Sequence, residues 1–169
     1  ERPANAPGSV VTASIEGTRP ILVELQALAS SSGYGTPRRT ILGLEPNRVA
    51  LLVAVMEKKL GMHLMGHDIF MNVAGGVKIS EPAVDLAVVA AIASSFLDRP
   101  VDEATLVLGE VGLAGEVRGI GNMETRMTEA AKMGFQRCIL PSRNRKQQTA
   151  GGIQVVGVGN VSEAIEALF

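Results

Sequence analysis

The chain has 169 residues, and its 16 Lys and Arg residues nearly balance its 17 Asp and Glu residues to give a formal net charge of −1. Hydrophobic residues make up 46% and aromatic residues 3%, a composition that is typical of a globular protein and excludes a wholly disordered chain. The single cysteine, Cys138, excludes an internal disulfide and a metal site built from several cysteines. The balanced charge argues against a uniformly basic nucleic-acid-binding protein but leaves local basic patches open.

The first nine residues predict a linker. They are polar and rich in proline, and they lack the basic and apolar regions of a signal peptide. Because residue 1 is not a methionine, we expect the chain to be part of a longer protein, with residues 1–9 as the linker to an upstream part and a domain at 10–169. The longest apolar run, 83–97, is shorter than the ~20 residues of a membrane-spanning helix. It therefore predicts a buried helix. Since neither a signal peptide nor a membrane-spanning segment is indicated, we expect a cytoplasmic protein.

The first half of the chain predicts four strands and one helix. Alternating apolar residues favour a pair of strands joined near Gly17, followed by two further strands. The helix is expected between Asn47, as its N-cap, and Gly61, where it ends. The four predicted strands are Val10–Ile15, Pro20–Leu28, Arg39–Leu42 and Asp68–Ala74.

The second half predicts three helices separated by short strands. A buried helix is expected over Ala83–Phe96 with Ser80 as its N-cap, and a second helix follows the capping residue Asn122. Asn160 and Glu163 have the spacing of a capping box for the last helix. The predicted strands are Leu106–Gly109, Glu116–Gly119, Cys138–Leu140 and Ile153–Val158. This order predicts a mixed β-sheet packed with helices, in a two-layer α+β or α/β domain.

Several motifs resemble binding sites but have simpler explanations. The glycines of 109–121 are interrupted by a predicted strand and lack the Lys-Ser/Thr of a phosphate-binding loop, so they favour tight turns. His63 and His67 have the spacing of two zinc ligands on a helix, but nearby glycines argue against a helix there. We therefore expect both histidines to be structural or at the surface, and Cys138 to be a buried, inert thiol.

A serine and a lysine near the middle of the chain have a spacing that a nucleophilic enzyme can use. Lys78 and Ser80 are two residues apart and would share one face of an extended segment. A lysine base requires burial, however, and Lys78 follows two glycines in a predicted exposed loop. A Ser-Lys peptidase built on this pair is the alternative to the leading hypothesis below.

The charges are separated along the chain into acidic and basic blocks. Residues 81–124 contain eight acidic and two basic residues, whereas 126–146 contain six basic residues and one acidic residue. Three explanations remain open, namely solvated surfaces, contacts with DNA phosphates, and docking of acidic to basic surfaces between subunits. The candidate DNA-binding residues are Arg38, Arg39, Lys58, Lys59, Arg143, Arg145 and Lys146.

Two long segments resemble one bacterial protein family. They are NVAGGVKISEPAVDL at 72–86 and GEVGLAGEVRGIGNMETRMTEAA at 109–131, and a shorter segment, ILVELQALAS at 21–30, matches as well. The family is that of the bacterial DNA repair protein RadA, also called Sms, and the likeness is to its C-terminal Lon protease-like domain. The resemblance implies an α+β fold of the Lon protease proteolytic-domain type, which is related to the second domain of a ribosomal small-subunit protein.

The same resemblance implies that a proteolytic dyad has been lost. Lon-type proteases place a serine nucleophile in a Gly-Pro-Ser-Ala-Gly turn and a lysine after an Ile-Gly-Gly-Leu stretch. The matching stretches here are EPAVD at 81–85 and IGNME at 120–124, so Ala83 replaces the serine and Glu124 replaces the lysine. Because alanine has no atom that can attack a carbonyl, the resemblance implies a domain without peptidase activity.

By resemblance, the whole protein is a DNA-dependent ATPase that promotes branch migration of recombination intermediates as a hexameric ring. Its ATP, magnesium and zinc sites belong to upstream domains, so no cofactor and no metal is expected within this domain. The domain would be a non-catalytic scaffold for ring formation that also contacts single- or double-stranded DNA. The RecA recombinase is a further expected partner, and no membrane is expected.

Overall fold

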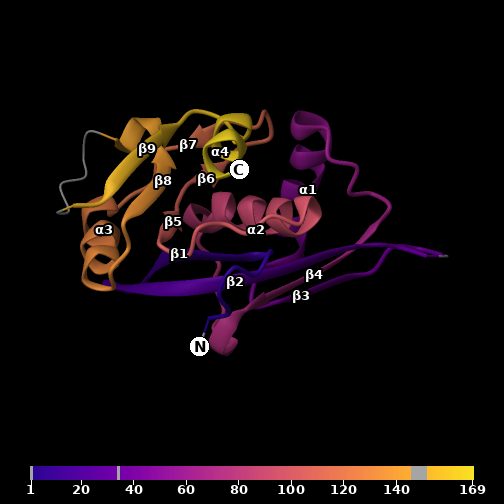
Figure 1. Ribbon diagram of the computed structural model, residues 1–169, viewed down its shortest axis with the longest axis horizontal. Coiled ribbons are helices and arrows are strands. Elements are labelled where there is room, and N and C mark those ends of the chain that lie inside the picture. Colours follow the sequence, from indigo (N-terminus) through magenta and orange to yellow (C-terminus); the bar gives the residue numbers. More distant parts are fainter. Residues whose placement is uncertain (1, 34, 146–151) are drawn as a thin grey trace.

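Seven strands form one mixed sheet in the computed structural model, which describes residues 2–33, 35–145 and 152–169 (Figure 1). The strands are β1 (Ser9–Glu16), β2 (Arg19–Ser31), β3 (Arg39–Leu42), β4 (His67–Val73), β5 (Thr105–Val107), β8 (Arg137–Pro141) and β9 (Gln154–Val158). Their order across the sheet is β3-β4-β2-β1-β5-β8-β9. A separate antiparallel pair consists of β6 (Glu110–Val111) and β7 (Val117–Arg118).

Four α-helices and three 3₁₀ turns connect these strands. The helices are α1 (Pro46–Leu60), α2 (Asp85–Leu97), α3 (Met123–Lys132) and α4 (Val161–Leu168). The 3₁₀ turns are η1 (Ala74–Gly76), η2 (Pro82–Val84) and η3 (Ser142–Asn144). Each strand and helix predicted from the sequence has a counterpart, with its ends shifted by a few residues, and the mixed α/β character is confirmed.

The sheet combines antiparallel and parallel pairs. β1 and β2 form the predicted hairpin, in which Gly17 adopts a left-handed φ of 63° and Glu16 pairs with Arg19. β2 is also antiparallel to β4, whereas the other neighbours, β3 with β4, β1 with β5, β5 with β8 and β8 with β9, are parallel. Parallel strands need crossover connections, which contain α1 between β3 and β4, α2 between β1 and β5, and α3 between β5 and β8, whereas η3 begins the connection from β8 to β9.

The expected two-layer arrangement is wrong, because helices pack on both faces of the sheet. α1, α2 and α4 share one apolar core with one face (Figure 1). α3 packs through Met123, Met127 and Ala130 on a second core on the opposite face of β1, β5 and β8. Successive residues of a strand point to opposite faces of the sheet. In these three strands successive residues such as Val10 and Val11 are both apolar and both buried, so both faces are covered.

α2 is the buried helix that its composition predicts. All ten residues from Asp85 to Ser94 are buried, and the helix lies between the sheet and α1 and α4. Burial on all sides is typical of a helix that is apolar around its whole circumference. Within the residues that the structure describes, no helix has the length and apolarity needed to cross a membrane.

Three of the expected side-chain caps are not formed, and one of these is that of Asn122, which precedes α3 without a capping hydrogen bond. α1 begins at Pro46, one residue before Asn47, and the Glu45 carboxylate accepts the N–H groups of Asn47 and Arg48 at 3.2 and 2.9 Å. Ser80 does not cap α2, because η2 intervenes and Val84 precedes the helix without a side-chain cap. Asn160 does cap α4, where its side chain accepts the N–H of Glu163 at 2.9 Å.

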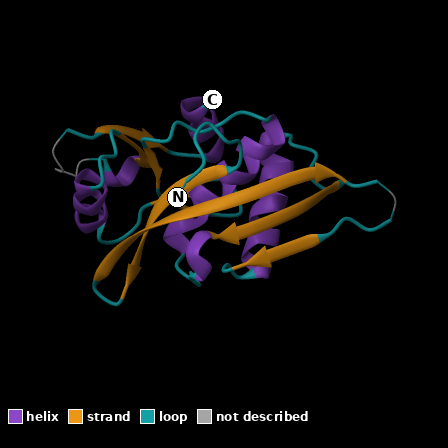
Figure 2. Cartoon of the chain, turned by 60° about the horizontal axis from the view of Figure 1, so that its bottom comes forward, coloured by secondary structure: helices purple, strands orange, loops and turns teal. Residues whose placement is uncertain are grey.

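The outer face of β3, β4 and the end of β2 carries no helix among the described residues (Figure 2), whereas α3 covers this face at the start of β2, near Leu22. Leu28 and Leu42 on this face are 57% and 58% exposed, and they line a shallow apolar hollow with Phe70. The cores therefore lie around α2 and beneath α3, and the turns between them hold the positions where the resemblance places a dyad.

Candidate functional site

The two positions of the expected dyad lie on different elements and in different surroundings. Ala83 lies in η2, is 4% exposed, and accepts the N–H of Gly109 at 2.9 Å through its carbonyl oxygen. Glu124 lies in the first turn of α3 and faces solvent beside Pro20 and Lys132. The structure therefore places a buried methyl group at one position and a solvated carboxylate at the other.

Glu81, just before Ala83, forms a nearly buried ion pair with Arg126 of α3. Its carboxylate accepts hydrogen bonds from Arg126, from the Ser14 hydroxyl at 3.1 Å and from the Ile15 N–H at 2.9 Å. Burial alone would raise the pKa of Glu81, but these hydrogen bonds and the charge of Arg126 outweigh burial and lower it. The carboxylate is therefore held ionised where a glycine would stand in the protease turn.

Arg126 is the largest of the fully buried side chains, with 2% of its surface exposed. Besides pairing with Glu81, its guanidinium donates to the carbonyl oxygen of Ala13 at 2.8 Å and to that of Gly121 at 3.0 Å. One arginine thus joins β1, the turn before α2 and the start of α3. Such a charge is stable in the interior only because several acceptors satisfy it.

Asp85, at the other end of the same turn, has its own arginine. It is 2% exposed and pairs with Arg48 of α1, whose Nε donates to the Asp85 carboxylate at 3.0 Å. The Val111 N–H donates to the same carboxylate at 3.0 Å, and Arg48 donates to the Val111 carbonyl oxygen at 3.2 Å. The pair therefore ties α1 and α2 to the β6 strand.

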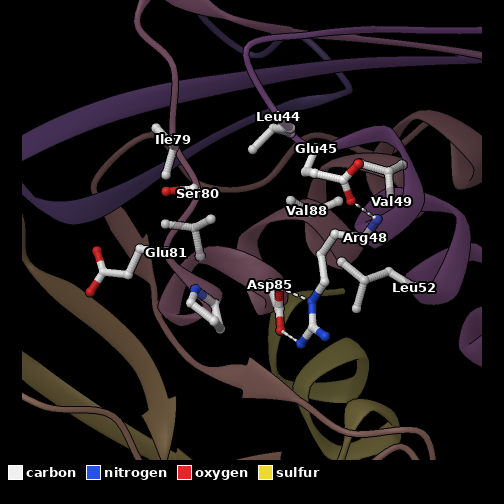
Figure 3. Close-up of a pocket in the computed structure, with 12 residues that line it drawn as sticks. Leu44, Glu45, Arg48, Val49, Leu52, Ile79, Ser80, Glu81, Asp85 and Val88 are labelled. Atoms are coloured by element: carbon white, nitrogen blue, oxygen red, sulfur yellow. Dashed lines mark hydrogen bonds and ion pairs between the residues drawn. The ribbon is translucent and has the colours of Figure 1, made fainter.

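A cavity of about 220 Å³ opens beside this turn, between α1 and η2 (Figure 3). Its apolar wall includes Leu44, Leu52 and Val88, and its polar groups include the Arg48–Asp85 pair. Glu81 turns away from that pair, toward the opposite side. Ala83 offers no hydroxyl at this turn, so a Lon-type acyl transfer has no nucleophile there.

The alternative serine–lysine pair lies at the surface. Lys78 and Ser80 are both exposed, and both line a shallow hollow of about 470 Å³ with Ile41 and Pro46. No hydrogen bond joins the two side chains in the described part of the chain. Lys78 thus lacks the buried surroundings that a lysine base requires.

The histidines and the cysteine have structural surroundings. His63 is exposed and its Nδ1 lies 3.3 Å from a Glu57 carboxylate oxygen, while the ring of His67 packs on Phe96 with centroids 5.2 Å apart. Cys138 is buried in β8, and burial raises the pKa of its thiol. Among the described residues, no group of three or more His, Cys, Asp or Glu side chains is placed to hold a metal ion.

The basic candidates at the start of β3 are tied to the protein itself. Arg38 lies over the Phe70 ring and pairs with Asp68 at 3.3 Å, and its backbone N–H lowers the pKa of that carboxyl. Arg39 donates to the carbonyl oxygens of His67 and Leu64, the latter at 3.2 Å. Both arginines remain exposed, but part of their hydrogen-bonding capacity is already used.

The other basic candidates lie at two separate places. Lys58 and Lys59 are exposed in the last turn of α1, where cations suit the helix dipole. Arg143 and Arg145 are exposed on either side of Asn144 in and after η3. Lys146 lies outside the described residues. The described candidates therefore come from three elements, namely the start of β3, the end of α1 and the η3 turn.

The arginines that pair with Glu81 and Asp85 were not predicted from the sequence. The sequence did contain a signal for such partners. The residues at 81 and 85 are carboxylates where the Lon-type motif has glycines, and a buried carboxylate requires a cation. Arg126 also shares the helical spacing of Met123 and Ala130, which bury the same face of α3. The spacing alone, however, does not show which carboxylate it meets.

The chain is similar over almost its whole length to proteins named DNA repair protein RadA. It is 54% identical over 166 residues to the protein from Bacillus subtilis and 48% identical over 167 residues to that from Halalkalibacterium halodurans, covering 98% of this chain and 36% of each relative. The Pseudomonas aeruginosa protein is 48% identical over 163 residues, which is 96% of this chain and 36% of the relative. The chain thus spans just over a third of the length of these curated relatives and matches their C-terminal region.

The family model described as "Subunit ChlI of Mg-chelatase" matches residues 29–144. The matched range extends from β2 to η3 and includes both arginine–carboxylate pairs and the turn that holds Ala83. Since this range is more than half of the chain, the chain belongs to the family described as subunit ChlI of Mg-chelatase.

Proposed function

We propose that this chain is a non-proteolytic, Lon-like scaffold domain of a RadA-type DNA repair ATPase. The name of its relatives supports a role in DNA repair, and the family match is compatible with a fold of the Lon proteolytic-domain type. The whole protein would promote branch migration of recombination intermediates. This domain would support its ring, expected to be a hexamer, and contact the DNA backbone.

The single observation that carries the proposal is the content of the turn at 81–85. Ala83 is buried without a nucleophilic atom, and the carboxylates on either side of it are each paired with an arginine from another helix. These pairs connect α1, α2 and α3, so the turn acts as a structural junction. A scaffold needs such rigid junctions, whereas a protease needs the same space for its substrate and its dyad.

The remaining chemistry is assigned to parts of the protein outside this chain. ATP, magnesium and zinc would bind to domains upstream of residues 1–9, which would connect those domains to this one. We expect the protein to act in the cytoplasm, with single- or double-stranded DNA and the RecA recombinase as partners. None of these assignments requires a cofactor within residues 10–169.

Peptidase assays test the proposal against its alternative, an active Ser-Lys peptidase that uses Ser80 and Lys78. The protein is incubated with an unfolded protein substrate and, separately, with a serine-reactive phosphonate, beside an active Lon protease as the positive control. We expect neither cleavage nor labelling. Labelling that is lost in the matched variant Ser80→Ala would instead establish the alternative.

A further inference from the structure

The outer face of β3, β4 and the end of β2 leaves apolar side chains in solvent within the described part of the chain (Figure 2). Leu28 pairs with Phe70 in the sheet and Leu42 pairs with Asn72, so these side chains point to one face. Leu28 and Leu42 are each more than half exposed and line a hollow of about 320 Å³. Contiguous apolar side chains on a solvent-facing surface are typical of a surface that another protein element covers.

The lining of this apolar hollow is uncharged among the described residues. Beside the apolar side chains it contains the amides of Gln26 and Asn72 and one hydroxyl group. Charged side chains stand at its ends, where Arg38 lies over the Phe70 ring and Glu24 accepts a hydrogen bond from Gln26. An apolar centre with a polar rim is the anatomy of a protein interface, whereas a surface for nucleic acid presents Lys and Arg to the phosphates. The hollow therefore suits a protein partner.

Gly8 brings the segment before β1 against the backbone of β2. Its φ is +91°, and a Cβ at this position would lie 2.1 Å from the carbonyl oxygen of Ala27, so the approach requires glycine. The Gly8 N–H donates to the Ser94 hydroxyl of α2 at 2.9 Å, and the Gly8 carbonyl oxygen accepts the Ala27 N–H at 2.9 Å. The segment that the sequence predicts as a linker therefore meets the domain at β2, next to Gln26 of the hollow.

Arg2 holds this segment on the outer face of the sheet. Ser9 shares a face with Val11, which packs on the same side as α3, and the N end lies on the side of the sheet away from α2 (Figure 1). Nε of Arg2 donates to the Ser9 hydroxyl at 2.9 Å, and this hydroxyl donates to a Glu24 carboxylate oxygen at 2.6 Å. The same oxygen accepts a hydrogen bond from Nε2 of Gln26 at 3.2 Å. A series of hydrogen bonds thus runs from Arg2 to the lining of the hollow.

An upstream part of the polypeptide would leave the domain from this face. The chain spans 36% of the Bacillus subtilis relative and matches its C-terminal region, so most of that relative lies upstream of the match. A part that is tethered at Arg2 meets the hollow at a high effective concentration, because the tether confines it. Docking of a tethered part also avoids most of the translational and rotational entropy that two free proteins lose.

We propose that the ATPase core upstream of residues 1–9 docks, within the same polypeptide, on the apolar hollow around Leu28, Leu42 and Phe70. The inference rests on the proposed function, which places that core upstream. It adds that residues 2–9 hold the core against this domain instead of acting as a free tether. The core must present an apolar projection, because a charge buried in the uncharged hollow would lose its hydration without gaining a partner.

Photo-crosslinking in the full-length protein identifies what occupies the hollow. The photoreactive amino acid benzoylphenylalanine replaces Leu42 or, as the matched control, Leu113, which is 71% exposed in the turn between β6 and β7. We expect position 42 to give an intramolecular product at the monomer mass, and mass spectrometry to locate its partner peptide in the upstream core. Position 113 should give no such product. A product at twice the monomer mass, which a second copy would give, or no product at position 42 would overturn the proposal.

Proteolysis of the connecting segment measures how firmly the core is docked. Leu28→Thr/Leu42→Thr removes apolar surface but keeps side chains that suit a strand, so circular dichroism should be unchanged. Because cleavage follows the population of the open form, we expect nicking between core and domain to become about tenfold faster, which is equivalent to about 1.4 kcal/mol of docking free energy. The control Leu113→Thr should be nicked at the rate of the wild type. Equal rates in the wild type and the double variant would contradict the docking.

ATP hydrolysis separates this inference from the function beneath it. If the full-length wild type hydrolyses no ATP, the proposed ATPase fails, and the docking of an ATPase core fails with it. If it hydrolyses ATP but position 42 gives no product at the monomer mass, only the docking is wrong. An intramolecular product from position 113 in equal yield would also overturn the docking, because it would show that the core contacts the domain without a preferred surface.

Discussion

Glu81 and Asp85 show, at the scale of single residues, how the turn at 81–85 is held in place. The resemblance aligns each carboxylate with a glycine of the protease turn, and each is paired with an arginine from a different helix. An unpaired charge in these positions would cost several kcal/mol, so each carboxylate and its arginine are stable only together. A serine substituted at Ala83 would still have a paired carboxylate on either side of it.

Acid should remove the stability that Glu81 contributes. Its folded pKa is lowered, so the folded protein keeps this carboxylate charged at pH values where the unfolded chain takes up a proton. The contribution is present above the unfolded pKa of about 4.3 and is lost as the pH falls through the folded value. We predict that Glu81→Gln, which is less stable than the wild type near neutral pH, loses less free energy of unfolding on acidification.

Urea unfolding at about pH 6 and about pH 3 measures this difference, on either side of the unfolded pKa. Glu57 and Asp68 also have lowered pKa values, but both are present in the two proteins and cancel in the comparison. Equal losses of free energy in the wild type and in Glu81→Gln would show that the Glu81–Arg126 pair contributes nothing to acid sensitivity.

At the scale of elements, the start of α1 gives a direct test of which residue caps a helix. Glu45 accepts two backbone N–H groups of the first turn, whereas Asn47 lies within the helix. We predict that Glu45→Ala lowers the free energy of unfolding by about 1 kcal/mol, the typical value of an N-cap. Asn47→Ala is the matched control and should be neutral or slightly stabilising, because alanine has the higher helix propensity. Chemical denaturation measures both, and a larger loss for Asn47→Ala would contradict the assignment.

The same helix shows what the sequence could predict and what it could not. Val49, Leu52 and Met56 follow helical spacing, and Gly61 with its left-handed φ of 65° ends the helix as expected. The error at Asn47 arose because two polar residues flank Pro46 and either can cap. Proline favours the first helical position, which makes the residue before it the cap.

The placement of α3 required contacts that no local pattern contains. Its apolar face was predictable, but it packs on the face of β1, β5 and β8 opposite α2. The Glu81–Arg126 pair likewise joins residues 45 positions apart, and Arg126 reaches Ala13 over 113 positions. Such pairings depend on the order of strands in the sheet, so the sequence predicted the turn at 81–85 but not the arginines that pair with its carboxylates.

At the scale of the whole molecule, several of the charges that nearly cancel in the net charge of −1 form ion pairs within the chain. Within the described residues, arginines from separate parts of the chain pair with carboxylates of the same chain. These pairs are Arg38–Asp68, Arg48–Asp85, Arg118–Glu110 and Arg126–Glu81. Three of the four carboxylates belong to the acidic block at 81–124, so that block has less free charge for a neighbouring subunit than its composition suggests.

Raising the salt concentration should therefore weaken DNA binding much more than it weakens assembly. If the proposed ring forms, we expect docking of the acidic block to contribute less than its composition suggests, because Glu81, Asp85 and Glu110, three of its eight carboxylates, are engaged within their own subunit. Raising the salt from about 0.1 M to about 1 M shortens the Debye length from about 10 Å to about 3 Å and screens exposed charges. We predict that sedimentation velocity of the full-length protein detects the same oligomer at both concentrations. DNA affinity should fall steeply over the same range, because phosphate contacts release counterions. Dissociation of the oligomer in parallel with the DNA would instead indicate that charge holds the subunits together.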